Sequence, residues 1–106
     1  MKRYEIRWTA LDPTRGAEMA KTRPAVIVSL DALNRRVQTV TVCPLTSELH
    51  PSWRSRLPVR CGGRPAEIAV DQIRTVSKVR LGDKIGSLTK DEAAALRRVI
   101  TEMYGD

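Results

Sequence analysis

The feature that most constrains the fold is a short, strongly apolar run that begins directly after an arginine and a proline. Arg23-Pro24 is followed at once by Ala25-Val26-Ile27-Val28. A proline holds the residue before it in extended backbone, and an unbroken apolar run is typical of a strand that is buried on both faces. We therefore predict a strand over residues 24–30 that needs cover on both sides, with the Arg23 guanidinium at its exposed end.

Hydroxyl side chains follow the next apolar run. Val40-Thr41-Val42 leads into Cys43-Pro44-Leu45-Thr46-Ser47, so a strand over residues 37–43 would present hydroxyls at its end. If this strand is a neighbour of the first, an arginine and a threonine meet at one end of a sheet. Such a pair can bind a phosphodiester, because a guanidinium can contact two phosphate oxygens and a hydroxyl can donate a further hydrogen bond to the phosphate.

The other segments predict further short strands and turns. Alternation predicts a first strand over residues 4–9, with Ile6 and Trp8 on one face and Glu5 and Arg7 on the other. Proline and glycine mark a turn over residues 12–16, and residues 47–55 are a polar loop. We expect strands over residues 57–60 and 66–70 around a connection at 61–65, and one or two more within residues 73–81.

The end of the chain predicts an amphipathic helix. Thr89 with Glu92 three residues later is a capping box, and Leu88 with Ala93 is spaced as a hydrophobic staple. Apolar residues then recur at helical spacing in a stripe of Ala93, Leu96, Val99, Ile100 and Met103. Several short strands closed by one helix predict a mainly β, partly open small barrel, and 106 residues fit a single domain over residues 1–106.

Composition adds weaker indications. The net charge is +7, with fourteen arginines against five lysines, and such a surface attracts phosphate backbones. Many small basic proteins never contact nucleic acid, so charge alone does not decide. Cys43 and Cys61 have no metal-ligand spacing around the single histidine, His50, and we predict neither a metal site nor a disulfide. No leader and no long apolar run is visible, which predicts a cytoplasmic protein without membrane contact.

Three segments resemble one known family. They are LDPTRGAEMAKTRPAVIVS at residues 11–29, CPLTS at 43–47 and AVDQIRTVSKVRLG at 69–82. In order and spacing they are similar to the MazF/PemK toxin endoribonucleases, from about Tyr4 to the C-terminal helix. The family usually has a glycine where this chain has Tyr4, which puts the entry turn of the first strand in question. The resemblance implies an SH3-like barrel that forms a homodimer.

The resemblance also implies a function. It implies sequence-selective cleavage of single-stranded RNA such as mRNA, without metal or cofactor, leaving a 2′,3′-cyclic phosphate or 3′-phosphate and a 5′-hydroxyl. It further implies a cognate antitoxin whose acidic, flexible tail covers the same basic groove. A mechanism based on a pair of histidines is excluded, because the chain contains only His50.

The catalytic candidates are Arg23, Thr46 and Glu18. Arg23 is placed to stabilise the charge that grows on a phosphorane, and the resemblance implies that it also takes part in proton transfer, although a guanidinium is a poor base. Thr46 matches the second catalytic position of the family, and Ser47 is chemically able to do the same work. Glu18 either accepts the 2′-hydroxyl proton or holds Arg23 in place.

RNA-binding candidates surround these residues. Trp53, flanked by Arg54 and Arg56, is a candidate platform for stacked bases, or instead a plug over the core or a dimer contact. Arg15, Lys21 and Arg56 are candidate contacts to the RNA backbone, and Ser47 joins this group. The segment 71–74, Asp-Gln-Ile-Arg, either lines a groove, as the family pattern implies, or forms a buried Asp–Arg bond within the barrel.

Two other functions remain open from the sequence. Related toxin folds bind and poison DNA gyrase without cutting RNA, but such a protein would not need both Arg23 and Thr46. A noncatalytic RNA-binding barrel is the second alternative, and it would bind RNA without cutting any strand.

Overall fold

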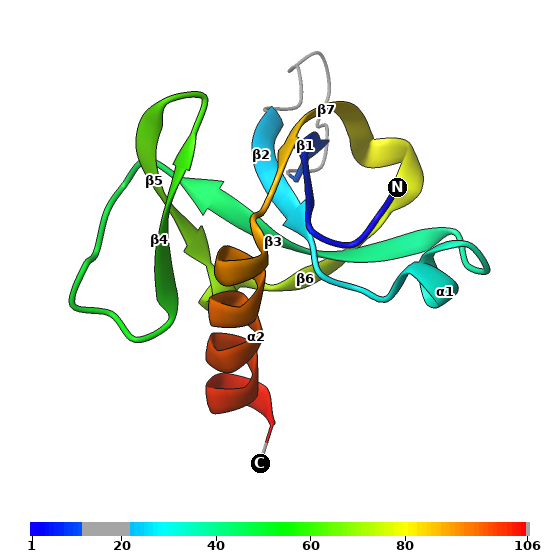
Figure 1. Ribbon diagram of the computed structural model, residues 1–106. Helices are drawn as coiled ribbons and strands as arrows, with labels where there is room; N and C mark the ends of the chain where they lie inside the picture. The colour runs from blue at the N-terminus through cyan, green and yellow to red at the C-terminus, as the bar shows by residue number, and fades with distance from the viewer. Residues whose placement is uncertain (12–21, 106) are drawn as a thin grey trace.

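The computed structural model describes residues 1–11 and 22–105, and it consists of antiparallel strands with one long helix (Figure 1). The strands are β1 (Glu5–Ala10), β2 (Thr22–Ile27), β3 (Thr39–Thr46), β4 (Arg56–Cys61), β5 (Arg64–Ala69), β6 (Arg74–Ser77) and β7 (Leu81–Ser87). The helices are α1 (Asp31–Asn34), α2 (Lys90–Tyr104) and two 3-10 turns, η1 (Val70–Gln72) and η2 (Lys78–Arg80).

The long strand β3 organises the sheet. It pairs with β2 along one edge, while its other edge is shared between β6, at residues 39–42, and β5, at residues 45–46. The strand order is β4-β5-β3-β2-β1-β7, with β6 also on β3. Because the second edge of β3 serves two separate partners, the sheet curls into a half-barrel (Figure 1). This confirms the predicted mainly β, partly open barrel.

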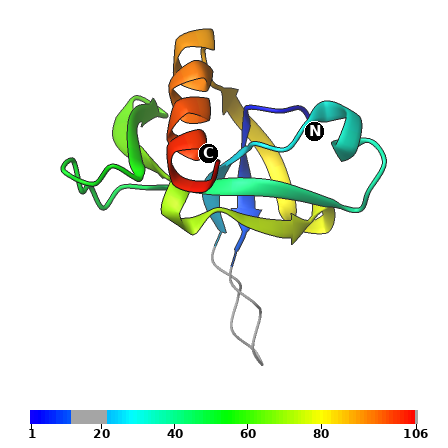
Figure 2. The same cartoon turned by 90° about the horizontal axis from the view of Figure 1, so that it is seen from below.

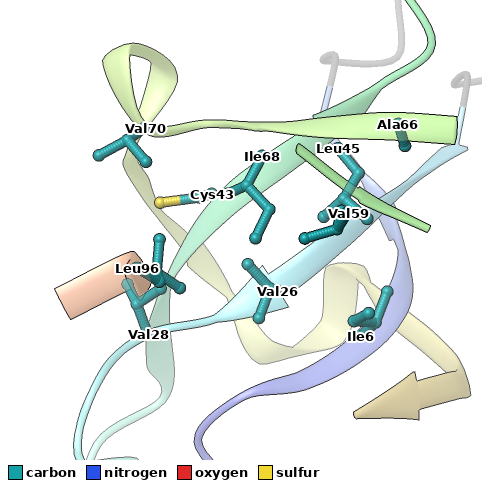
Figure 3. Packing of buried hydrophobic residues seen from close by; sticks show 10 residues of the cluster. All are labelled: Ile6, Val26, Val28, Cys43, Leu45, Val59, Ala66, Ile68, Val70 and Leu96. Carbon is teal, nitrogen blue, oxygen red and sulfur yellow. The ribbon is translucent and has the colours of Figure 1, made fainter. Parts of the chain in front are cut away.

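The strand β2 is covered on both faces, as predicted. Val26 and Val28 belong to a large apolar cluster beneath α2, in which Leu96 of the helix points toward Val28 (Figure 3). Ala25 and Ile27, on the opposite face, belong to a second cluster with residues of β3 and β6. Residues 25–27 have no exposed surface at all, so the apolar run is explained by its position between two clusters.

The helix α2 begins with the predicted capping box. The Glu92 backbone N–H donates to Thr89 Oγ1 over 3.1 Å, and the Thr89 N–H donates to Glu92 Oε1 over 2.8 Å. The helix lies between the β4–β5 hairpin and the β1–β2 pair (Figure 2). Ala93 and Leu96 are buried, but Met103 is exposed, because the last helical turn extends beyond the sheet (Figure 1). The predicted stripe is thus wrong at Met103.

The other differences from the predicted elements lie at strand ends and in two elements that were not predicted. The first strand begins at Glu5, because Tyr4 has a left-handed backbone with φ 71°, where the resemblance pointed to a glycine. The third strand runs three residues further than predicted, to Thr46. The strand β7 and the short helix α1 were not predicted. The predicted turn over residues 12–16 lies outside the described residues. No helix in the described ranges is long and apolar enough to cross a membrane.

Candidate active site

Arg23 and Thr46 lie in one groove, which we call the main groove. Thr9 of β1 is paired with Arg23, and Ala25 of β2 is paired with Pro44 of β3. Two further steps of this antiparallel register bring Thr46 opposite Arg23. The groove encloses about 580 Å³ and is lined by Trp8, Arg23, Pro24, Leu45, Thr46, Ser47, Glu48, Cys61, Gly62, Arg64, Pro65, Ala66 and Ile85.

Arg23 is an exposed residue at the second position of β2. Across residues 1–11 and 22–105, no side chain or backbone carbonyl is bonded to its guanidinium. It also borders a smaller side groove of about 310 Å³, lined by Leu11, Pro44, Gln72 and Arg74. Arg23 therefore stands between two grooves, where its fork of N–H donors is available to an anion in either.

Thr46 is half-buried, and one of its acceptor sites is occupied. The Glu48 backbone N–H donates to Thr46 Oγ1 over 3.0 Å. A hydroxyl has one hydrogen to donate, and among the described residues that hydrogen has no bonded acceptor. Thr46 can thus donate into the groove, and the exposed Ser47 lies next to it.

Three residues of the main groove were missed from the sequence: Trp8, Arg64 and Glu48. Trp8 was placed on the Ile6 face of β1 as expected, yet it is 45% exposed, because this face passes from the core into the groove. Arg64 follows the Gly62-Gly63 turn, where both glycines have positive φ. Its place in the same groove as Arg23 depends on the curling of the sheet, and no local pattern signals that.

Trp53 and Arg54, two further predicted RNA contacts, do not line the main groove. Trp53 is 46% exposed and is not a core plug, and its ring is stacked on His50 with centroids 3.9 Å apart. Arg54 is ion-paired with Glu102 of α2. Glu18, Arg15 and Lys21 lie outside the described residues.

Arg56 is buried, against the expectation that its side chain is free to contact RNA. Its Nε donates to Asp71 Oδ1 over 2.9 Å, and its Nη1 lies 3.6 Å from Glu67 Oε1. The guanidinium carbon also lies 4.7 Å from the centre of the Trp53 ring. Strand alternation places Arg56 on the same face of β4 as the exposed Arg60, so its burial comes from the loop of residues 47–55 and the two carboxylates that cover it.

The segment 71–74 divides between two settings. Asp71 bonds Arg56, which lies outside the segment, while Gln72 and Arg74 line the side groove. Burial opposes ionisation of Asp71, but hydrogen bonds from Arg56, Ser55 and its own backbone, with the Arg56 charge, hold its pKa below the usual value.

The two cysteines are free thiols in different settings. Cys43 is buried in the core, and burial, with a smaller effect of the Asp71 charge, raises the pKa of its thiol to about 12. Cys61 is half-buried at the edge of the main groove. In the described part of the chain no cluster of His, Cys, Asp and Glu is arranged to hold a metal.

Comparison with known proteins identifies the family. A sequence profile of the PemK-like, MazF-like toxins of type II toxin–antitoxin systems matches residues 2–104. The chain belongs to this PemK/MazF toxin family. Endoribonuclease MazF2 of Mycobacterium bovis is 31% identical over 94% of this chain and 96% of its own. Endoribonuclease EndoA of Bacillus subtilis is 32% identical over 83% of this chain and 80% of its own.

Solved structures confirm the PemK/MazF fold. A mycobacterial endoribonuclease in complex with its cognate antitoxin superposes with a TM-score of 0.82 at 22% identity, covering 99% of this chain and 95% of that one. The Mycobacterium tuberculosis toxin MazF-mt6 gives 0.78 at 22% identity, over 94% and 95% of the two chains. The predicted toxin endoribonuclease is thus confirmed at the level of the family, and the gyrase-binding alternative gains no support from these relatives.

Proposed function

We propose that this chain cleaves single-stranded RNA such as mRNA at the main groove, by attack of the RNA's own 2′-hydroxyl on the adjacent phosphorus. The observation that carries the proposal is the convergence of Arg23 and Thr46, from neighbouring strands, on one groove. In this reaction the 2′-hydroxyl loses its proton and its oxygen bonds to phosphorus, the bond to the 5′-oxygen breaks, and that oxygen takes up a proton, so a 2′,3′-cyclic phosphate and a 5′-hydroxyl result. The nucleophile belongs to the substrate, so the protein supplies alignment and charge stabilisation.

Arg23 acts on the phosphate. Its guanidinium is positively charged at neutral pH and is not occupied by another described residue. Two of its N–H groups bind non-bridging oxygens and stabilise the additional negative charge of the transition state more than that of the ground state.

Thr46 donates its hydroxyl hydrogen to the same phosphate. The Glu48 backbone N–H occupies an acceptor site of Oγ1 and leaves this hydrogen free to donate. A threonine hydroxyl is too weak a base to accept the 2′-hydroxyl proton near neutral pH. Ser47 is a second donor at the same end of β3.

The 2′-hydroxyl proton needs an acceptor, and we propose a carboxylate for this role. Glu18 stays the prediction from the sequence. Among the described residues, Glu48 is the carboxylate that borders the main groove, two residues after Thr46. Replacing each by glutamine separates the two, since loss of the base lowers kcat with little change in KM.

Trp8 and Arg64 bind the RNA on either side of the scissile phosphate. Trp8 offers an exposed indole inside the main groove, whereas the Trp53 ring is already stacked on His50. A stacked base contributes about 1–3 kcal/mol, so we expect Trp8 to contribute more to RNA affinity than Trp53. Arg56, buried under its loop, serves the fold.

The proposed partners follow from the charge of the groove. An acidic, flexible antitoxin segment would compete with RNA, since both bring anions to Arg23. We further propose a homodimer of the single domain 1–106, acting in the cytoplasm.

The test is a cleavage assay with purified protein and long, end-labelled single-stranded RNA in EDTA. We expect discrete cuts with 5′-hydroxyl ends, and their loss in the Arg23→Ala variant. Arg36→Ala removes an exposed arginine outside both grooves and is the charge-matched control that should cut as the wild type does. Intact RNA across varied sequences, with the protein folded, would overturn the proposal. A gel shift without cleavage would favour the RNA-binding barrel.

A further inference from the structure

A buried ion pair lies beneath the loop that follows Thr46. The side chains of Arg56 and Glu67 are only 5% and 3% exposed, and Arg56 Nη1 lies 3.6 Å from Glu67 Oε1. A buried ion pair offsets the cost of removing its charges from water only when further hydrogen bonds occupy the remaining donors and acceptors. Here the further partners are Asp71, on Arg56 Nε, and the backbone of residues 47–55.

The pair makes hydrogen bonds to the backbone of the 47–55 loop at two points. Glu67 Oε1 accepts the His50 backbone N–H over 2.8 Å, and Arg56 Nη1 donates to the Glu48 carbonyl oxygen over 3.4 Å. Both side chains come from the sheet itself, Arg56 from the first position of β4 and Glu67 from β5. The loop is therefore bonded to the rigid part of the fold close to Thr46.

Glu48 connects the pair to the Thr46 hydroxyl. Its carbonyl accepts from Arg56, and its N–H donates to Thr46 Oγ1 over 3.0 Å. Glu67 is also the residue paired with Thr46 between β5 and β3. The contacts thus form a closed ring, from Thr46 to Glu48, Arg56, Glu67 and across the sheet to Thr46 again.

We propose that the buried Arg56/Glu67 pair positions the Thr46 hydroxyl through Glu48. The ring keeps the Glu48 N–H on one acceptor site of Oγ1, so the hydroxyl hydrogen points away from it, toward the groove. The pair itself touches no substrate and is a positioning device. Its effect on cleavage rests on the proposed function, whereas its effect on the Glu48 hydrogen bond does not.

The test removes the pair as a unit. Arg56→Met with Glu67→Leu replaces two buried charges by apolar side chains of similar length, which buried sites often tolerate. We expect a folded protein whose kcat falls about 10²-fold, the size of effect that a small misplacement of a catalytic group produces, with KM for RNA within about twofold. The single variant Glu67→Gln keeps an acceptor for the His50 backbone N–H and should retain most of the wild-type activity. Arg7→Met removes an ion-paired arginine of β1 and is the matched control.

Two readouts separate positioning from general damage. In a Thr46→Ala background the double substitution should lower kcat no further, because its target is gone. Amide hydrogen exchange at Glu48 should become faster in the double variant and stay as in the wild type in Arg7→Met. An equal loss of kcat in both backgrounds, or a Glu48 amide protected as in the wild type, would overturn the inference.

Each failure has its own signature. If the wild type cuts no RNA, the proposed function is wrong, and Glu48 exchange still decides the positioning claim. If the double variant does not fold, Arg56→Lys takes its place, because lysine keeps the charge but cannot bond Asp71 and the Glu48 carbonyl with one planar fork. Faster Glu48 exchange in that variant supports the inference, and unchanged exchange overturns it.

Discussion

Arg23 and Arg56 lie at the beginnings of two strands of the same sheet, yet their surroundings are opposite. Arg23 is exposed between two grooves and has no bonded partner among the described residues. Arg56 is buried, and its guanidinium contacts Asp71, Glu67 and a loop carbonyl. A charge committed to internal partners stabilises the fold, while an uncommitted charge is available to a ligand. Residue type alone therefore does not assign the role.

The largest expected effect is on stability at the buried arginine. Arg56→Ala should lower the free energy of unfolding by about 3–5 kcal/mol, because Glu67 would remain as a buried charge without its partner. Chemical unfolding measures this, with the exposed Arg60→Ala on the same strand as the control, expected within about 0.5 kcal/mol of the wild type. A loss as small as that of the control would break the comparison.

The next effect is on activity at the exposed arginine. Arg23→Ala should lower cleavage about 10²–10³-fold, the cost of removing a donor that stabilises transition-state charge. Its melting temperature should match the wild type, because no described contact is lost. Rates are measured under single turnover beside thermal unfolding. Full activity, or a loss that follows a fall in melting temperature, would contradict the assignment.

Acid should weaken the buried network. The pKa of Asp71 is lowered in the folded state, mainly by the bond from Arg56 acting against burial, so its stabilisation is present above the usual value of 3.8 and is lost as pH falls through the lowered pKa. Urea unfolding from about pH 6 to about pH 3 should show falling stability. Asp71→Asn should be less stable at the higher pH and lose less on acidification. The fall in stability that remains in Asp71→Asn comes in part from Glu5. Burial opposes ionisation of Glu5, but bonds from Lys2 and Arg7 outweigh it and lower its pKa.

The smallest effect sharpens the contrast at a second, exposed pair. Arg54 is ion-paired with Glu102, and its side chain is 85% exposed. Arg54→Met should change the free energy of unfolding by less than about 1 kcal/mol, because water screens such pairs. The same variant tests the predicted RNA contact, since a raised KM with unchanged stability would place Arg54 on the RNA. A stability loss like that of Arg56→Ala would show that burial is not what separates the two pairs.

The sequence predicted those features that depend on neighbouring residues. The capping box of α2 and the two-sided burial of β2 follow from local spacing. Arg23 and Thr46 share a groove because they lie at adjacent ends of the neighbouring strands β2 and β3. Arg56 was misjudged because the loop before β4 and Glu67 cover its side chain, although Arg60 on the same strand face is exposed. Its partner Asp71 lies 15 residues further along the chain. Only the folded sheet brings them together.

Tyr4 shows how a resemblance can locate a strained position without explaining it. Tyr4, where the family usually has a glycine, adopts a left-handed backbone, with φ 71°. That conformation costs on the order of 1–3 kcal/mol for a residue other than glycine. The ring is held by Arg97 of α2, whose Nη1 donates to the Tyr4 hydroxyl over 3.0 Å. A contact with a helix 93 residues away offsets part of the strain, and no local pattern contains it.

The most direct test of the account is a double-mutant cycle on Arg23 and Thr46, measured as single-turnover cleavage of one RNA by the wild type, Arg23→Ala, Thr46→Ala and the double variant. If both side chains act on the same phosphate, the double variant should lose less activity than the product of the two single losses. Losses that multiply fully would contradict a shared phosphate, and so would a Thr46→Ala variant that cuts as fast as the wild type.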